Sequence, residues 1–127
     1  MDETDARTRV PVSETRAETT HLVLPSHSNA LGTVFGGQIA AWCDICAAVS
    51  AQRFARSVVV TASMDELHFL EPVHTGMVVV FQSQVNCAWS TSMEIGVHVE
   101  AENAKEGTRR HCCTAYLTFV AVGEDGK

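Results

Sequence analysis

An aspartate stands alone within a long and nearly apolar segment of this sequence. The positions three and four residues from Asp44 in either direction, which share its face of a helix, are all alanines. They are Ala40, Ala41, Ala47 and Ala48. No cation of the same helix can therefore neutralise Asp44, and the small side chains leave space beside it. Such a carboxylate suits a general base acting on water, or a nucleophile attacking a carbonyl. A solvent-facing aspartate, or one bonded across a dimer, fits the same pattern.

Two glycines and an asparagine come shortly before Asp44. Gly36 and Gly37 would open the helix, where unpaired N–H groups carry partial positive charge and a bare backbone admits a ligand. The N–H of Gly37 could polarise a carbonyl and stabilise its oxyanion, although a tight turn or close packing also explains the glycines. Asn29 lies in the preceding loop. Its amide could bind a water or a substrate carbonyl, or stabilise a turn.

Other polar residues give weaker candidates. His27 lies close to Asn29, but no nucleophile accompanies it, and we interpret it as a loop residue. Ser90, Thr91 and Ser92 lie between two predicted strands, where hydroxyl and N–H groups can meet a phosphate or simply form a polar hairpin. The cations available to an anionic ligand are Arg53, Arg56, Lys105, Arg109 and Arg110.

Composition excludes several classes of function. Fifteen acidic against nine basic residues give a net charge of -6, which argues against a nucleic-acid surface. No segment reaches the about 20 apolar residues of a membrane span, so we expect a soluble protein. Five cysteines, four of them in apolar runs, indicate core thiols in a reducing cytoplasm. Cys43 and Cys46 have CxxC spacing, but no second pair follows, and we predict no metal site.

The pattern along the chain predicts one domain of the α+β class. Residues 1–16 are expected to form a flexible tail, 17–122 a single domain, and 123–127 a C-terminal tail. A first strand from Ala17 stops before Pro25, a loop covers 26–33, and a long helix reaches Ala55. Apolar residues recur on one helix face at Ile39, Cys43, Cys46, Ser50 and Phe54. Strands are predicted at 58–69, 77–89, 93–100 and 108–122.

A single helix can cover only one face of a single antiparallel sheet, and the edges of that sheet need pairing or protection. The run from Val58 to Val60 would expose apolar β-branched side chains at such an edge. Pairing two copies edge to edge would bury them. The sequence therefore predicts a homodimer with a continuous sheet.

An ordered set of motifs carries a family resemblance. It consists of LPS followed by Asn29, FGG at 35–37, Asp44, and VTASMDELHFLEPV ending at Val73. From about His21 to Val122 the chain resembles the hotdog-fold acyl-CoA thioesterases, the group of bacterial YciA-like enzymes and animal acyl-CoA hydrolases. The resemblance implies a hotdog fold, with one long central helix wrapped by a five-stranded antiparallel sheet. It also implies dimers that share a sheet, often assembled as a trimer of dimers.

The resemblance further implies a composite site that hydrolyses acyl-CoA to a free acid and coenzyme A. Asp44 would be base or nucleophile, Asn29 of the neighbouring subunit would orient water or carbonyl, and the Gly37 amide would polarise the thioester. Coenzyme A contacts carry over to Arg56, Ser90, Thr91 and Ser92. No cofactor is expected, because coenzyme A belongs to the substrate.

Two departures from the family pattern concern the loop before the helix. His27 replaces an acid found in some relatives, and Leu31 replaces a more polar residue. A non-catalytic protein that binds acyl-CoA or acyl-carrier protein is the alternative function. An enoyl-thioester hydratase ranks last, because such enzymes usually rely on a helical histidine that this helix lacks.

Overall fold

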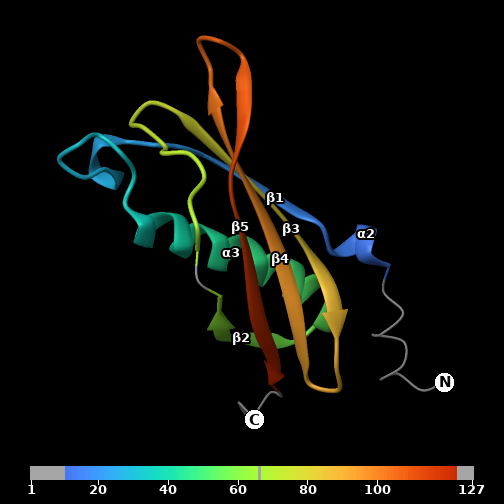
Figure 1. Ribbon diagram of the computed structural model, residues 1–127. Coiled ribbons are helices and arrows are strands. Elements are labelled where there is room, and N and C mark those ends of the chain that lie inside the picture. Colours follow the sequence, from blue (N-terminus) through green and yellow to red (C-terminus); the bar gives the residue numbers. More distant parts are fainter. Residues whose placement is uncertain (1–10, 66, 123–127) are drawn as a thin grey trace.

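One long helix and five strands make up most of the chain. The computed structural model describes residues 11–65 and 67–122, and Figure 1 shows their arrangement. The helix α3 spans Gly36–Ala55. The strands are β1 (Ala17–Leu22), β2 (Val58–Met64), β3 (Val78–Ala88), β4 (Ser92–Asn103) and β5 (Thr108–Val122). A short α2 (Val12–Thr15) and a 3-10 turn η1 (Pro25–His27) complete the order.

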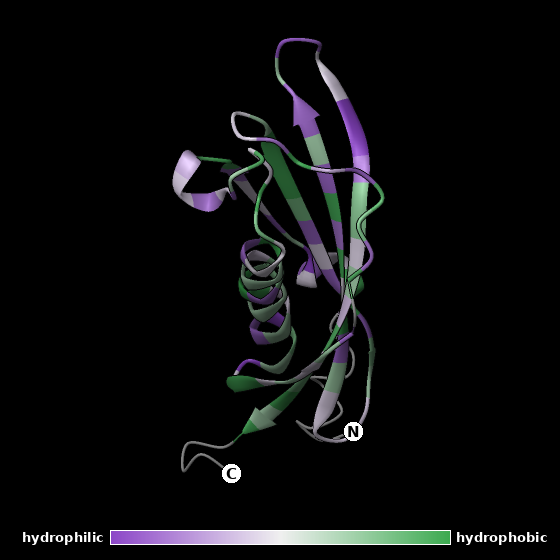
Figure 2. Ribbon diagram, turned by 60° about the vertical axis from the view of Figure 1, so that its left-hand side comes forward, coloured by the Kyte–Doolittle hydropathy of each residue, from purple (hydrophilic) through white to green (hydrophobic). Residues whose placement is uncertain are grey.

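The five strands form one antiparallel sheet in the order β1-β3-β4-β5-β2. Figure 2 shows the helix packed against one face of this twisted sheet. A central helix held in a curled five-stranded sheet is the hotdog fold, so the predicted fold class is confirmed. The described residues contain no helix that is long and apolar enough to cross a membrane.

The core lies between α3 and the inner face of the sheet. β4 alternates strictly, with Met93, Ile95, Val97 and Val99 buried and the residues between them partly exposed. The predicted helix face meets this layer: Ile39, Cys43, Cys46 and Ser50 have no exposed surface, and Phe54 is half-buried. The opposite helix face is open, since the Ile45 side chain is 60% exposed. The nearly apolar helix is therefore not buried on most sides within a single chain.

Small polar side chains join the helix to the sheet inside the core. The hydroxyls of Ser50 on α3 and Ser83 on β3 lie 2.6 Å apart, and Ser83 also donates to the carbonyl of Cys46 at 3.0 Å. Both serines are buried. Since buried hydroxyls are costly without partners, this contact fixes how α3 sits along β3.

Element boundaries differ most from the sequence prediction in β2 and β4. β2 ends at Met64 rather than at 69, and the described residues between it and β3 form no further strand. β4 continues to Asn103, beyond the predicted end at 100, because β5 pairs with it as far as Thr108. Within the segment expected as a tail, α2 packs on the domain and its buried Thr15 accepts the N–H of Val85. The tail residues 1–10 and 123–127 lie outside the described residues.

The sheet has two unlike edges, β1 and β2. β2 pairs only with β5 in this chain, and the side chains of Val58 and Val60 are 58% and 47% exposed. A bulge between Thr61 and Ser63 interrupts its register. β2 is thus the apolar open edge that the sequence predicted at 58–60.

Candidate active site

Asp44 lies in the middle of α3 and faces the edge strand. The hydroxyl of Thr61 on β2 donates a hydrogen bond to Asp44 Oδ1 at 2.6 Å. Asp44 is half-buried, and no ion pair to it is found in the described parts of the chain. The helix thus supplies no cation, as predicted, and a neutral hydroxyl orients the carboxylate instead. The other carboxylate oxygen is left to interact with water or substrate.

Asn29 organises a tight turn with its side-chain oxygen. Asn29 Oδ1 accepts three donors: the N–H of Leu31 at 2.9 Å, the N–H of Thr33 at 3.2 Å and the Thr33 hydroxyl at 3.1 Å. The backbone N–H of Asn29 also donates to the Thr33 carbonyl at 2.8 Å. Three donors at one atom fix which end of the amide is oxygen. The Nδ2 group has no acceptor among the described residues, so it remains a free donor held in a fixed direction.

At the start of α3, Gly36 and Gly37 leave the backbone uncovered by side chains. The Gln38 N–H bonds to the carbonyl of Phe35, whereas the N–H groups of Gly36 and Gly37 meet no backbone acceptor in the described segments. A methyl group on Gly36 would touch the Phe69 ring at 3.6 Å, but one on Gly37 would meet nothing within 4 Å. Gly37 also lacks the positive φ that favours glycine. Neither packing against the described residues nor backbone conformation therefore explains a glycine at position 37.

These groups do not converge within one chain. No hydrogen bond links Asp44 to Asn29 in the described residues. Gly37 lies seven positions before Asp44 on the same helix face, about two turns or roughly 10 Å along the axis, so no single atom can contact both groups. Because Asp44 is bonded to β2, it lies at the open edge of the sheet, where a second copy would pair.

The predicted coenzyme A contacts gather at one end of the sheet. Ser90 and Thr91 lie in the turn from β3 to β4, and Ser92 begins β4. The Thr91 carbonyl accepts the N–H of Ala121 at 2.9 Å. Ala121 pairs with Val59 near the start of β2, shortly after Arg56. Arg56 caps α3 in the left-handed conformation, with φ 54°. The structure therefore brings the two parts of this predicted subsite to the same corner of the sheet.

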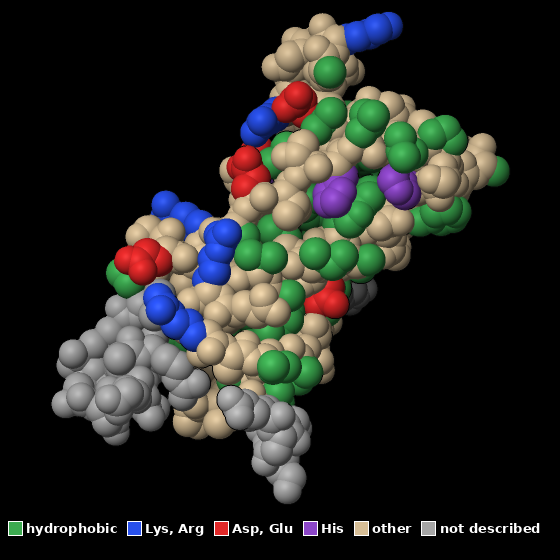
Figure 3. All heavy atoms as spheres, turned by 180° about the vertical axis from the view of Figure 1, so that it is seen from behind, with side chains coloured by type: hydrophobic (Ala, Val, Ile, Leu, Met, Phe, Trp, Pro, Cys, Tyr) green, Lys and Arg blue, Asp and Glu red, His purple; other side chains and the backbone are tan. Residues whose placement is uncertain are grey.

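Apolar side chains surround the site on the helix side of the molecule. Figure 3, seen from that side, shows apolar patches over the helix and adjoining segments with few charges among them. The large exposed apolar residues on α3 or beside its start are Leu31, Phe35, Ile45 and Phe69. The departure at Leu31 belongs to this set, since its side chain is 85% exposed. This surface is suited to contact an acyl chain or a second copy of the chain.

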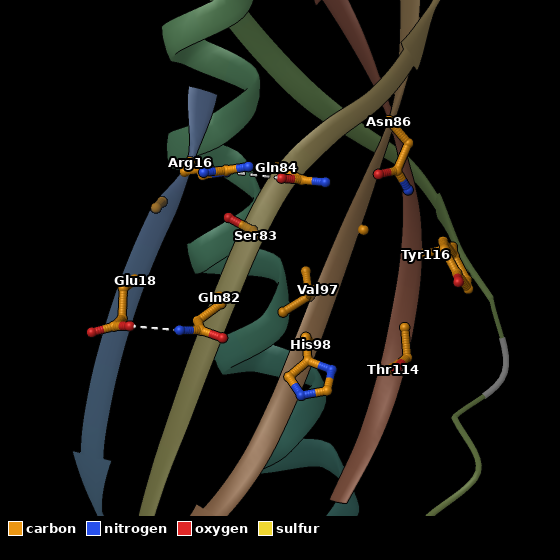
Figure 4. Close-up of a pocket in the computed structure, with 12 residues that line it drawn as sticks. Arg16, Glu18, Gln82, Ser83, Gln84, Asn86, Val97, His98, Thr114 and Tyr116 are labelled. Atoms are coloured by element: carbon orange, nitrogen blue, oxygen red, sulfur yellow. Dashed lines mark hydrogen bonds between the residues drawn. The ribbon is translucent and has the colours of Figure 1, made fainter. Parts of the chain in front are cut away.

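A hollow of about 580 Å³ lies on the opposite face of the sheet. Figure 4 shows its side chains projecting from the strands with the helix behind them. Glu18, Gln82, His98 and Thr114 line it side by side, one each from β1, β3, β4 and β5. None of the predicted site residues lines it. We therefore place the candidate site at the helix and the β2 edge, where the chemistry-bearing groups lie, and not at this hollow.

Four of the five cysteines are core residues, and Cys87 is exposed. All five are free thiols, and Cys43, Cys46, Cys112 and Cys113 are buried. Burial, with smaller contributions from neighbouring thiols and Asp44, raises the pKa of Cys43 to about 12, which keeps it neutral and poorly nucleophilic. The described residues hold no group of three metal-binding side chains. The CxxC spacing thus reflects one helix face in the core.

Thr61 was missed by the sequence analysis. It lies inside the VTASMDELHFLEPV motif, directly after the valine run, but a threonine in a strand is ordinarily just a β-favouring residue. Its pairing with Asp44 depends on the crossing of α3 over β2, which local pattern does not reveal. The sequence shows a threonine at position 61, but it does not show that this threonine contacts Asp44.

Comparison with known proteins gives consistent matches along the chain. Acyl-coenzyme A thioesterase 11 of Mus musculus is 39% identical over 122 residues, which is 95% of this chain but 20% of that protein. The chain thus spans about a fifth of this curated relative. A solved apo-hexameric acyl-CoA thioesterase is 41% identical, with a TM-score of 0.89 over 93% of this chain and 76% of that chain.

The acyl-CoA hydrolase of Staphylococcus aureus is a third similar protein. Its complex with butyryl coenzyme A, coenzyme A and coenzyme A disulfide is 34% identical, with a TM-score of 0.87 over 91% of this chain and 71% of that one. Structures of that enzyme also exist with alanine replacing one aspartate, one asparagine and one threonine. A family model described as the Thioesterase superfamily matches residues 31–108, more than half of the sequence. With its hotdog fold, this chain belongs to the thioesterase superfamily.

Proposed function

We propose that this protein is an acyl-CoA thioesterase that works as a symmetric oligomer. Asp44 acts as general base or nucleophile, and Asn29 of the neighbouring subunit orients the water or carbonyl. The proposal depends most on one observation: a carboxylate oriented by Thr61 lies at an unpaired sheet edge, beside apolar surface. In the Staphylococcus aureus enzyme, the substituted asparagine, aspartate and threonine are separated by 15 and then 17 positions, the spacing of Asn29, Asp44 and Thr61.

In the general-base route, the Asp44 carboxylate takes a proton from a water molecule while the water oxygen attacks the thioester carbon. Negative charge develops on the carbonyl oxygen, where the free N–H of Gly37 and the Nδ2–H of Asn29 are suited to donate. Collapse of the tetrahedral intermediate breaks the C–S bond and releases coenzyme A as thiolate, which is then protonated. The acyl group leaves as a carboxylic acid.

In the nucleophilic route, an Asp44 oxygen attacks the carbonyl carbon directly and expels the thiolate, which leaves a mixed anhydride on the enzyme. Water then cleaves the anhydride and regenerates Asp44. Single-turnover hydrolysis in oxygen-18 water detects the nucleophilic route when water attacks the Asp44 carboxyl carbon of the anhydride, because label then remains on Asp44. Neither route needs a cofactor.

The oligomer follows from the open edge of the sheet. Pairing β2 with β2 of a second copy would continue the sheet, cover Val58 and Val60, and bring one subunit's Asp44 toward the other's loop. We propose a homodimer on this basis, assembled further as a trimer of dimers. A similar solved thioesterase is hexameric, which supports this assembly. Arg56 with Ser90, Thr91 and Ser92 would hold the coenzyme A phosphates, and the free thiols accord with a cytoplasmic location.

A panel of acyl-CoA substrates tests the assignment. We expect Asp44→Asn to lower kcat by about 10²–10⁴-fold, the range of general acid–base catalysis, with little change in coenzyme A binding. The exposed Asp65, whose backbone N–H bonds to Tyr116, offers a matched control, and Asp65→Asn is expected to retain activity. Equal activity in wild type and Asp44→Asn would overturn the catalytic assignment. Saturable binding without turnover of any thioester would indicate the non-catalytic alternative.

A further inference from the structure

His27, interpreted from sequence as a loop residue, is tied to both neighbouring elements. The N–H of Leu24 donates to His27 Nδ1 at 3.1 Å, and the N–H of His27 donates back to the Leu24 carbonyl at 2.9 Å. This reciprocal pair closes the turn η1. A ring nitrogen that accepts an N–H carries no proton, so this contact fits the His27 tautomer with its proton on Nε2.

The ring of His27 also contacts the helix that carries Asp44. It lies edge-on to Trp42 with centroids 4.9 Å apart and an interplanar angle of 80°. Trp42 is only 7% exposed, and its ring stacks on His21 of β1 at 4.3 Å. Since Trp42 is two residues before Asp44, this cluster links the η1 turn to α3 near the catalytic position.

The backbone of His27 holds the start of the helix. Its carbonyl accepts the N–H of Phe35, the N-cap residue of α3, at 3.0 Å. The chain between these residues forms the Asn29 turn and a bridge between Ser28 and Val34. His27 therefore holds the segment that positions both Asn29 and the free N–H of Gly37.

We propose that neutral His27 is a positioning residue for the hydrolysis, which holds the 24–35 segment so that Asn29 and the helix start face the thioester. This inference rests on the proposed thioesterase function. Protonation of Nδ1 would replace an acceptor by a donor opposite the Leu24 N–H, and would break the closure of the turn. The catalytic geometry would then loosen as the pH falls.

The groups around His27 come from three elements. β1 contributes His21, whose pKa is lowered by burial and further by His27. α3 contributes the uncharged Trp42, and the loop after β2 contributes Thr75, whose hydroxyl lies 2.6 Å from that of Ser28. No ion pair to His27 occurs among the described residues. Because folding disfavours the proton on His21, stability is present at higher pH and lost as pH falls through the histidine range.

Two substitutions separate the parts of this role. In His27→Asn, the amide oxygen is as many bonds from Cα as Nδ1 is, so it can accept the Leu24 N–H without titrating. We expect near wild-type kcat, and a shallower fall in kcat between about pH 8 and about pH 5, where imidazoles ordinarily gain a proton. His27→Phe keeps a ring against Trp42 but loses the acceptor. We expect kcat to fall by about tenfold at all pH values, as small misplacements do, with KM changed less.

The matched control is His111→Asn, on the sheet face away from the helix, which is expected to keep the wild-type pH profile. His21 remains in every variant, and both His27 variants lose the same effect of His27 on the His21 pKa, so its titration cancels between those two variants. Nitrogen-15 NMR gives a readout without turnover: His27 should be protonated on Nε2 at high pH, and the Asn29 side-chain amide signals should move in His27→Phe only. If the wild type hydrolyses no thioester, the proposed function fails while these spectra still decide the part played by His27. An Nδ1–H tautomer, or pH profiles unchanged in both variants, would overturn the proposal.

Discussion

At the scale of single residues, each candidate group has one hydrogen-bonding site occupied and one left open. Thr61 occupies one Asp44 oxygen, and three donors occupy the Asn29 oxygen while its Nδ2 stays free. The occupied sites fix the direction of each side chain. The open ones are then aimed without loss of conformational freedom during the reaction, which is the advantage of preorganised donors in catalysis.

Gly37 gives the sharpest residue-scale prediction. A methyl group there meets nothing in this chain, and alanine is a better helix former than glycine. We expect Gly37→Ala to leave stability unchanged or to raise it by up to about 1 kcal/mol. The same methyl group would obstruct the approach of a carbonyl to the Gly37 N–H, so we expect kcat/KM to fall by about 10²-fold, as when one oxyanion donor is lost.

Urea unfolding and acyl-CoA kinetics on the same preparation measure both effects. Ala40→Gly, three residues further along the same helix, is the control, because it introduces a helical glycine instead of removing one. We expect it to lower the free energy of unfolding. Full activity in Gly37→Ala would exclude the Gly37 N–H at the start of α3 from the mechanism.

At the scale of elements, the sequence predicted features that follow from a repeating apolar pattern. It missed features that depend on how neighbouring strands pair. The face of α3 from Ile39 to Ser50 was predictable because apolar residues recur at helical spacing. The burial of both Cys112 and Cys113 breaks the alternation of β5. The cause is a bulge, since Val99 pairs with Cys113 and Glu100 with His111, which leaves Cys112 without a partner. Bulges and strand ends are set by neighbouring strands, so local pattern does not show them.

For the candidate site, residue types were predictable and contacts between elements were not. The residue types at Asn29, Gly37 and Asp44 were readable from the sequence, because each is unusual in its setting. Their bonds were not: the Thr61 contact joins α3 to β2 across 17 positions, and the His27 contacts depend on where η1 meets Trp42. Side-chain partners that lie on different elements follow from the packing angle between them, which the sequence leaves open.

The end of α3 carries a second prediction, at Arg56. Its left-handed backbone, φ 54°, is the conformation that glycine adopts at helix ends at little cost, whereas other residues pay about 1 kcal/mol. We expect Arg56→Gly to raise the free energy of unfolding by about that amount. If the guanidinium holds a coenzyme A phosphate, the same change raises KM for acyl-CoA by about tenfold, the loss of one charge-assisted contact.

Acyl-pantetheine, which lacks the nucleotide phosphates, distinguishes this contact from a general disturbance. Its KM is expected to be the same for wild type and Arg56→Gly. Arg56→Lys, which keeps the charge and the left-handed residue, controls for the backbone. An unchanged KM for acyl-CoA in Arg56→Gly would exclude Arg56 from the predicted subsite.

At the scale of the whole molecule, the chain is half of the unit that the proposed chemistry needs. No hydrogen bond joins Asp44 to Asn29 among the described residues, and the carboxylate lies against an edge strand with one side unpaired. In a symmetric pair, each site would combine Asp44 of one subunit with Asn29 of the other, and two equivalent sites would form. The apolar surface at Val58, Val60 and Ile45 would be covered at the same time.

Mixed oligomers test whether the site is shared. When Asp44→Asn and Asn29→Ala chains are co-expressed, half of the dimers carry one chain of each kind, and each mixed dimer has one intact composite site. Activity should therefore return to about a quarter of wild type, although each variant alone is inactive. The reverse experiment co-expresses wild type with a chain carrying both substitutions. Composite sites make its mixed dimers inactive, whereas sites within one chain leave them half active. About half of wild-type activity in the second mixture, rather than about a quarter, with no recovery in the first would show that both residues act from the same subunit. The shared-site proposal would then fail.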